Sequence, residues 1–133
     1  MRKKAAPRAE TATTGACLCG AVRFTLQGEP TRIGLCHCHD CRRASGSAFA
    51  MFLVWERSAF ACTGPTKTYE GRSFCQTCGS RVFSLRAEEA EIMGGALDQA
   101  PTGFAPAYEI WTKRREPWLR PLRSAEQFDE DRE

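Results

Sequence analysis

The stretch "GLCHCHDCRRASG", residues 34–46, carries the densest group of reactive side chains in this 133-residue chain. Three cysteines and two histidines occupy the six positions from Cys36 to Cys41, and two arginines follow. Thiolates and imidazoles are ligands that zinc prefers. Four of them close a structural site, whereas three leave one position for a substrate. The stretch is therefore a candidate for a disulfide knot, a closed zinc site or a zinc site with an open position.

The arrangement of the cysteines favours metal binding over disulfides. Seven of the eight fall into the tight groups C-L-C, C-H-C-H-D-C and C-Q-T-C, and Cys62 stands apart. Such spacings are poor disulfide geometry, and closing so short a loop stabilises a fold little. The same spacings are good chelating pairs for a metal ion, so the pattern predicts metal sites.

Two of these groups together predict one closed site. Cys75 and Cys78 have the C-x-x-C spacing of a zinc knuckle, and Gly79 behind them permits a tight turn that points backbone N–H groups at sulfur. Cys17 and Cys19 form the second pair, since residues i and i+2 of an extended strand face the same side. We expect these four thiolates to hold a structural zinc that joins the N-terminal strand to the middle of the chain.

The remaining group, Cys36, Cys38 and Cys41, predicts a second zinc with three thiolate ligands and one position left for a substrate. An internal fourth ligand is the alternative, and the candidates for it are His37, His39 and Cys62. In a strand His37 points away from the two cysteines that flank it, while His39 sits in the turn that follows.

An open three-thiolate zinc suits a thiol substrate, because a thiol bound to zinc loses its proton and becomes a nucleophile. Beside such a centre, His39 is a candidate for proton transfer, and a hydrogen bond that holds the turn is its plainer role. Arg42 and Arg43 are candidates for binding a substrate carboxylate, since the guanidinium fork matches that group. A solvated helical face is the plainer role for these arginines.

The segments between the cysteines predict an all-β fold with little helix. Short runs typical of strands, such as 21–28, 31–38 and 48–55, alternate with turn residues along most of the chain. Residues 39–45 have room for one helical turn that ends at Gly46. We expect a disordered segment at 1–13, one zinc-binding domain at 14–122 and an acidic, frayed tail at 123–133.

Composition and charge argue against several classes of protein. The net charge of +3 is too small to favour nucleic acid as a partner. No apolar segment follows the basic N-terminus, so no secretory signal is predicted, and no apolar run is long enough to span a membrane. We expect a cytoplasmic protein with a small-molecule partner, and a homo-oligomer remains open.

The chain resembles the family of glutathione-dependent formaldehyde-activating enzymes, whose domain is shared with centromere protein V. The residues that carry the resemblance are GACLCGAVRF (15–24), CHCHDCRRASGSAF (36–49), FCQTCGSRVF (74–83), GGALD (94–98) and EIWTKRREPW (109–118). Glu109 departs from the pattern, because many family members have a histidine there, so the ligand of this chain can differ from that of the type enzyme.

The resemblance implies a β-tent of short antiparallel sheets with zinc sites at their junctions. It implies a structural zinc on Cys17, Cys19, Cys75 and Cys78 and a catalytic zinc on Cys36, Cys38 and Cys41. The implied activity is that of a carbon–sulfur lyase, which condenses formaldehyde with glutathione to S-hydroxymethylglutathione. A zinc-stabilised binding or chaperone-like module without catalysis is the alternative. Centromere protein V suggests a nucleic-acid partner as a third reading, against which the modest charge counts.

Overall fold

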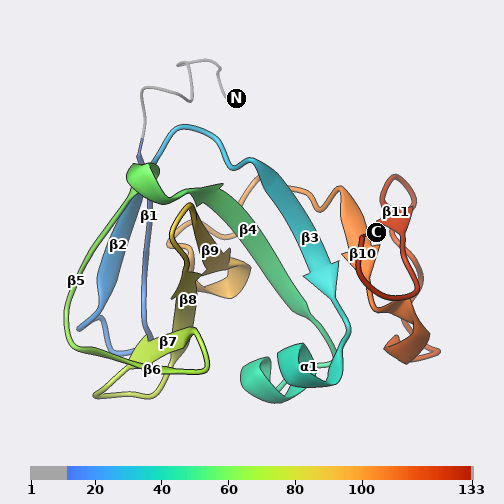
Figure 1. Cartoon of the computed structure of the whole chain (residues 1–133), viewed down its shortest axis with the longest axis horizontal. Helices are drawn as coiled ribbons and strands as arrows, with labels where there is room; N and C mark the ends of the chain where they lie inside the picture. The colour runs from blue at the N-terminus through green and yellow to red at the C-terminus, as the bar shows by residue number, and fades with distance from the viewer. Residues whose placement is uncertain (1–11, 133) are drawn as a thin grey trace.

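Alternating apolar residues in the N-terminal part of the chain build the smaller of two sheets (Figure 1). In the computed structural model, which describes residues 12–132, strand β2 (Arg23–Gln27) buries Phe24 and Leu26 and exposes the residues between them. This period of two is that of a strand with one face in the core. Strand β2 pairs antiparallel with both β1 (Ala12–Ala16) and β5 (Phe60–Thr63).

Eight strands form the larger sheet, which is mixed. Their order across the sheet is β11 (Glu126–Gln127), β10 (Tyr108–Ile110), β3 (Arg32–Cys36), β4 (Ala50–Glu56), β9 (Glu89–Met93), β8 (Arg81–Leu85), β7 (Arg72–Cys75) and β6 (Thr66–Tyr69). All neighbours pair antiparallel except β10, which runs parallel to both β3 and β11. The predicted all-β fold with little helix is confirmed, and the two parallel pairings refine the expectation of purely antiparallel sheets.

The central strand β4 divides the interior into two cores, because its successive side chains point to opposite faces. Leu53 and Trp55 pack with Phe24, Phe60 and other residues in a core that lies between the two sheets. Phe52 and Val54 pack on the other side, where the second core consists of Cys36, Phe52, Val54 and Tyr108, with Cys38 and Cys41 packed against it. The second cysteine group therefore lies on the opposite face of β4 from the main core.

The helical elements are short. Helix α1 (His39–Ser45) begins after Cys38, whose sulfur accepts a hydrogen bond from the backbone N–H of Cys41 at 3.3 Å. It ends at Gly46, which has a left-handed φ of 67° that favours glycine, so the predicted helical turn is confirmed. Three single 3₁₀ turns complete the secondary structure of residues 12–132: η2 (Arg57–Ala59), η3 (Gly94–Ala96) and η4 (Thr112–Arg114).

Part of each terminal segment that was expected to be disordered or frayed belongs to a strand. Of the segment 1–13, expected to be disordered, residues 12 and 13 begin β1, and the others lie outside the described residues. The acidic segment 123–133, expected to fray, contributes β11 up to residue 127 and then packs Phe128 on Tyr108, with ring centroids 6.5 Å apart. Backbone pairing with β10 orders this segment although its side chains are mostly polar.

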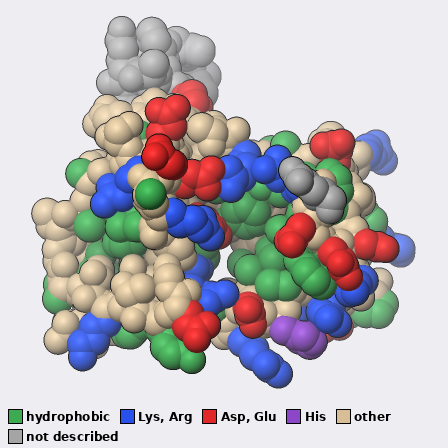
Figure 2. Space-filling view, in the orientation of Figure 1, with side chains coloured by type: hydrophobic (Ala, Val, Ile, Leu, Met, Phe, Trp, Pro, Cys, Tyr) green, Lys and Arg blue, Asp and Glu red, His purple; other side chains and the backbone are tan. Residues whose placement is uncertain are grey.

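Basic and acidic side chains are intermixed on the face of the molecule that Figure 2 shows. Among residues 12–132 no helix is long and apolar enough to cross a membrane.

Candidate metal centres

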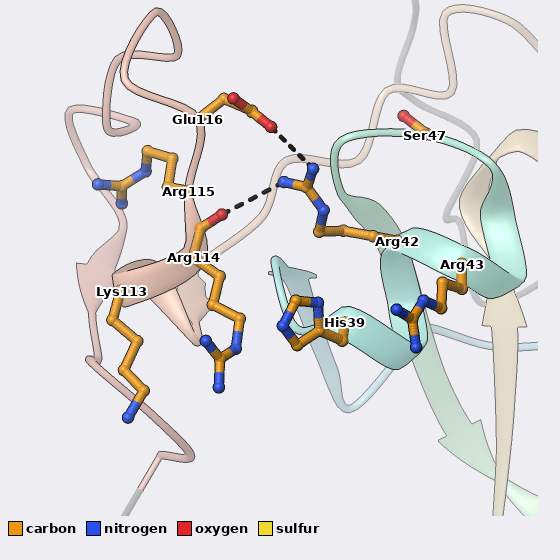
Figure 3. Close-up of a pocket in the computed structure, with 8 residues that line it drawn as sticks. All are labelled: His39, Arg42, Arg43, Ser47, Lys113, Arg114, Arg115 and Glu116. Carbon is orange, nitrogen blue, oxygen red and sulfur yellow. Dashed lines mark hydrogen bonds and ion pairs between the residues drawn. The ribbon is translucent and has the colours of Figure 1, made fainter.

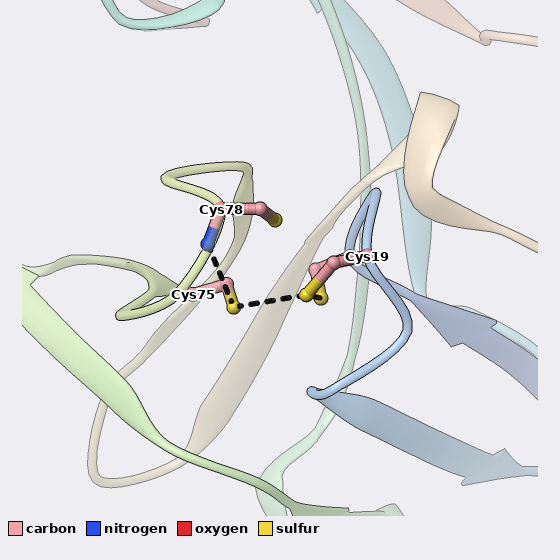
Figure 4. A group of neighbouring side chains, drawn as sticks. Cys19, Cys75 and Cys78 are labelled. Carbon is pink, nitrogen blue, oxygen red and sulfur yellow. Dashed lines mark hydrogen bonds between the residues drawn. The ribbon is translucent and has the colours of Figure 1, made fainter.

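Four cysteines from the two sheets meet at the junction between them (Figure 4). Cys17 and Cys19 follow β1 of the smaller sheet, Cys75 ends β7 of the larger sheet, and Cys78 lies just beyond it. Sulfur–sulfur distances are 3.7 Å from Cys17 to Cys19 and 3.8 Å from Cys19 to Cys75. Zinc–sulfur bonds of about 2.3 Å place the corners of a tetrahedron about 3.8 Å apart. The group therefore fits a tetrahedral metal ion.

Backbone N–H groups surround these sulfurs in the way that thiolate ligands require. The sulfur of Cys75 accepts hydrogen bonds from the N–H groups of Thr77 at 3.3 Å and Cys78 at 3.4 Å, and Gly79 behind the pair has a φ of 78°. The sulfur of Cys17 accepts the N–H of Val22 at 3.2 Å. Such donors stabilise negative sulfur, and a residue with a side chain would be strained in place of the glycine.

The expectation that Cys17 and Cys19 lie on an extended strand is wrong. Strand β1 ends at Ala16, and the two cysteines form a turn in which the N–H of Gly20 donates to the carbonyl of Cys17 at 3.1 Å. Gly20 has a φ of 85°, which lets the chain reverse there. The two sulfurs converge because the turn curls them together, and the alternation of a strand plays no part.

The thiols of this first group ionise unequally. Burial raises the pKa of Cys17, but the N–H of Val22 and the neighbouring thiols stabilise its thiolate more strongly, so its pKa falls to about 6. The pKa of Cys19 is raised to about 11. A hydrogen bond from the backbone of Ala21 lowers this pKa, but desolvation and the neighbouring thiols together raise it by more. The pKa of Cys78 is also lowered, chiefly by a hydrogen bond from the backbone of Ser80, so two thiols of the group favour the thiolate form, which suits a cation.

The second group, Cys36, Cys38 and Cys41, comes together where β3 passes into α1. All three sulfurs lie within 4.8 Å of one another. Among residues 12–132, no ligand atom of any other His, Cys, Asp or Glu joins this group at that spacing, so none of the candidates for an internal fourth ligand is in place. Three thiolates and a free coordination position are the donor set of a catalytic metal site.

Ionisation in the second group also falls on one sulfur. The pKa of Cys41 is lowered to about 7, first because the thiol of Cys36 donates to it. The pKa of Cys36 is raised strongly by that same bond and by burial. Among the more distant charges, the carboxylate of Glu91 raises the pKa of Cys41, and the guanidinium of Arg81, whose own pKa is lowered by burial, lowers it by less.

The ring of His37 turns away from these sulfurs and forms a buried hydrogen bond. Its Nε2 lies 2.7 Å from Oε1 of Glu109, and both side chains are 2 % exposed. Oε2 of Glu109 accepts the backbone N–H of Leu122 at 2.7 Å and the side-chain amide of Gln127 at 3.1 Å. The carboxylate therefore ties the strand that carries the second group to the C-terminal segment. Sequence reasoning placed His37 away from the metal but did not find this partner, which lies 72 positions further along the chain.

A cavity of about 670 Å³ opens beside the second group, and Cys36 and Cys41 are part of its wall. Its charged residues are balanced, with three guanidinium groups and three carboxylates: Arg32, Arg86, Arg132, Glu89, Glu91 and Asp131. Arg32 binds Glu89 with both nitrogens, at 2.7 and 3.1 Å. Tyr108 contributes the one hydroxyl of the lining residues. Sequence reasoning missed this wall because its residues come from distant segments with no local spacing to connect them.

His39, Arg42 and Arg43 line a different cavity, in which no cysteine takes part (Figure 3). Arg42 is bound there to the carboxylate of Glu116 at 2.7 Å and to the carbonyl of Arg114 at 3.3 Å. The structure thus brings the seven clustered cysteines into two groups, and it directs these three side chains of α1 elsewhere.

Comparisons with known proteins identify the family of the chain and a similar fold. A family profile described as glutathione-dependent formaldehyde-activating enzyme matches residues 12–114, so the chain belongs to that family. A crystal structure of a Rhodobacter sphaeroides protein has a similar fold, with a TM-score of 0.52 and 22% sequence identity over 70% of this chain and 97% of that one. A search of curated proteins finds no match.

Proposed function

We propose that this protein is a zinc-dependent carbon–sulfur lyase of the formaldehyde-activating type, which joins a thiol such as glutathione to formaldehyde, or separates them. The observation that carries the proposal is the three-cysteine group that forms part of the wall of a 670 Å³ cavity. Cavities of this size suit ligands as large as a tripeptide. Family membership supports the same reaction class.

The donor set supports two zinc ions with different roles. Cys17, Cys19, Cys75 and Cys78 would hold the structural ion, because they join the two sheets and their spacing matches a closed tetrahedron. Cys36, Cys38 and Cys41 would hold the catalytic ion. When bound there, zinc supplies a soft cation that keeps a substrate thiol in its thiolate form.

The charged residues of the cavity support glutathione as the thiol. Glutathione carries two carboxylates and one ammonium group, so it needs cations and anions in one pocket. Arg132 would bind one of its carboxylates, since the guanidinium fork matches that group. Arg86 and Glu91 pair with each other at 3.2 Å, and they would exchange this pairing for the second carboxylate and the ammonium group of glutathione. Arg32 is held in place by Glu89, whose pKa is lowered chiefly by this hydrogen bond.

Tyr108 would position the carbonyl and supply the proton that the reaction needs at oxygen. As the sulfur forms its bond to the carbonyl carbon, the electron pair of the C=O bond moves to oxygen, which takes a proton, and the thiol proton leaves. The phenol lies in the cavity wall with Cys36 and Cys41. The pKa of Arg32 is raised chiefly by Glu89 and to a lesser extent by Tyr108, so the phenol lies close to that guanidinium. No other reactant is required.

We propose a cytoplasmic location, because seven cysteines in two metal-ligand groups suit a reducing compartment. The test is exchange NMR on formaldehyde and glutathione with zinc-loaded protein. We expect acceleration by the wild-type chain and a loss of about tenfold to a hundredfold in Tyr108→Phe, since general acid catalysis typically supplies at least this much. Tyr69→Phe is the matched control, because Tyr69 is 70% exposed on β6. No acceleration by the fully loaded wild-type protein would reject the activity and leave a zinc-stabilised binding module.

A further inference from the structure

A second cavity, of about 620 Å³, lies between α1 and the segment around η4 and has a strongly positive wall (Figure 3). Five cationic side chains and one carboxylate line it, together with His39: Arg42, Arg43, Lys113, Arg114, Arg115 and Glu116. Two further carboxylates, Glu130 and Glu109, pair with Lys113 and Arg115 of this wall, so five cations share three carboxylates and an excess of two positive charges remains.

Three of these cations already have carboxylate partners. Arg42 binds Glu116 at 2.7 Å, Lys113 binds Glu130, and Arg115 lies 3.6 Å from Glu109. Within residues 12–132, neither Arg43 nor Arg114 forms a salt bridge with an acidic side chain. Figure 3 shows these two guanidinium groups approaching from opposite elements, Arg43 from α1 and Arg114 from η4, with His39 between them.

A strained turn holds Arg114 in this position. Trp111, directly before η4, has a φ of 58° and a ψ of 40°, a left-handed conformation that a bulky side chain rarely adopts. The C-terminal segment maintains it: the N–H of Trp111 donates to the carbonyl of Glu130 at 2.9 Å, and its indole N–H donates to Asp131 at 3.0 Å. The guanidinium of Arg114 lies over the indole ring, 5.8 Å from its centroid.

We propose that this cavity binds a phosphate group, with Arg43 and Arg114 as its two forks. A carboxylate has its two oxygens in one plane, so it best matches donors that lie in that plane. A phosphate has oxygens arranged as a tetrahedron and accepts from forks on two sides at once. The ordering of Arg114 on Trp111 reduces the side-chain entropy that binding would cost. Glutathione, with a net charge of −1, matches the cavity of the cysteine group better than this one.

The experiment is calorimetric titration of the full-length, zinc-loaded chain with pyrophosphate, inorganic phosphate, ADP and acetate. We expect pyrophosphate to bind more tightly than phosphate, acetate to bind least, and the affinity to fall with salt. Arg43→Ala and Arg114→Ala each should weaken pyrophosphate by about tenfold, the worth of a charge-assisted fork. Arg120→Ala, an exposed arginine outside the cavity, should change nothing. ADP binding tighter than pyrophosphate would identify a nucleotide as the source of the phosphate, and equal binding would identify the phosphate alone.

Three results would overturn the proposal. These are no binding of pyrophosphate at millimolar concentration and low salt, equal affinity in wild type and both variants, or acetate binding as tight as phosphate. Because both arginines lie at the surface, their replacement should leave the thermal unfolding midpoint unchanged, and this control separates lost binding from lost folding. The result is independent of the lyase activity, which is measured on the other cavity.

Discussion

Replacing Glu109 tests whether its buried hydrogen bonds behind the second cysteine group contribute to folding. Its carboxylate is 2 % exposed and accepts three hydrogen bonds, from His37 at 2.7 Å, the Leu122 N–H at 2.7 Å and Gln127 at 3.1 Å. In Glu109→Gln one terminal atom becomes a donor, so at least one of these bonds is lost or weakened, and Arg115 loses its partner at 3.6 Å. We expect a loss of about 2 kcal/mol in the free energy of unfolding, the worth of a hydrogen bond to a charged group.

Glu109→Ala should cost more, about 3–5 kcal/mol, because it leaves His37 and the Leu122 N–H buried without an acceptor. The assay is urea unfolding of zinc-loaded protein at fixed free zinc, followed by tryptophan fluorescence. The matched control is Glu116→Gln, whose carboxylate binds Arg42 at 2.7 Å but is 32% exposed, so its loss should cost less than about 1 kcal/mol. If Glu109→Gln and Glu116→Gln unfold at the same urea concentration, the buried pair does not stabilise the fold and the reasoning fails.

Three further predictions follow from the same contacts. Burial raises the pKa of Glu109, but the Leu122 N–H, His37 and Gln127 lower it more, so the pKa in the folded state lies below the usual 4.5. The stability that the ionised Glu109 contributes should therefore be complete above pH 4.5 and should vanish as the pH falls through the lowered pKa. Unfolding curves of wild type and Glu109→Gln should converge in acid. Gly34→Ala should destabilise the folded protein by about 1–3 kcal/mol and reduce activity, because the added Cβ would lie 2.8 Å from the rings of Phe52 and Tyr108. Gly95→Ala is the control, since a Cβ there meets nothing within 4 Å. Equal melting temperatures of the two variants would contradict this prediction. In native mass spectrometry, Cys38→Ser should keep its fold and one metal ion, and Cys75→Ser should lose its fold; a folded Cys75→Ser chain would argue against a structural role for the first group.

The parts of this protein that the sequence predicts well are those with a local signature. Metal chelation requires short spacings between ligands, so the sequence alone predicts that Cys75 and Cys78 belong to one metal site and Cys36, Cys38 and Cys41 to another. The alternation of β2 and the glycine at the end of α1 are local in the same way. The turn at Cys17 was missed because C-x-C suits both a strand and a turn, and only the φ of Gly20 decides between them.

The other parts depend on contacts between distant segments. His37 and Glu109 lie 72 positions apart, and nothing in either neighbourhood indicates their pairing. Arg42 is a candidate for a substrate carboxylate by its position in the sequence, and its hydrogen bond to Glu116 depends on the packing of the η4 segment near α1. The two-residue strand β11 has no apolar pattern and forms through backbone pairing with β10. Such features require the tertiary structure.

The most direct test of the account is the rate of exchange between formaldehyde and glutathione with wild-type protein and with Cys38→Ser, both loaded with zinc. Serine is a good N-cap residue and preserves the start of α1, where the sulfur of Cys38 accepts the N–H of Cys41, so the substitution removes a thiolate without removing the cap. The account predicts acceleration by the wild type, and none by a Cys38→Ser chain that is folded and retains the first metal ion. Equal acceleration by the two proteins would contradict it.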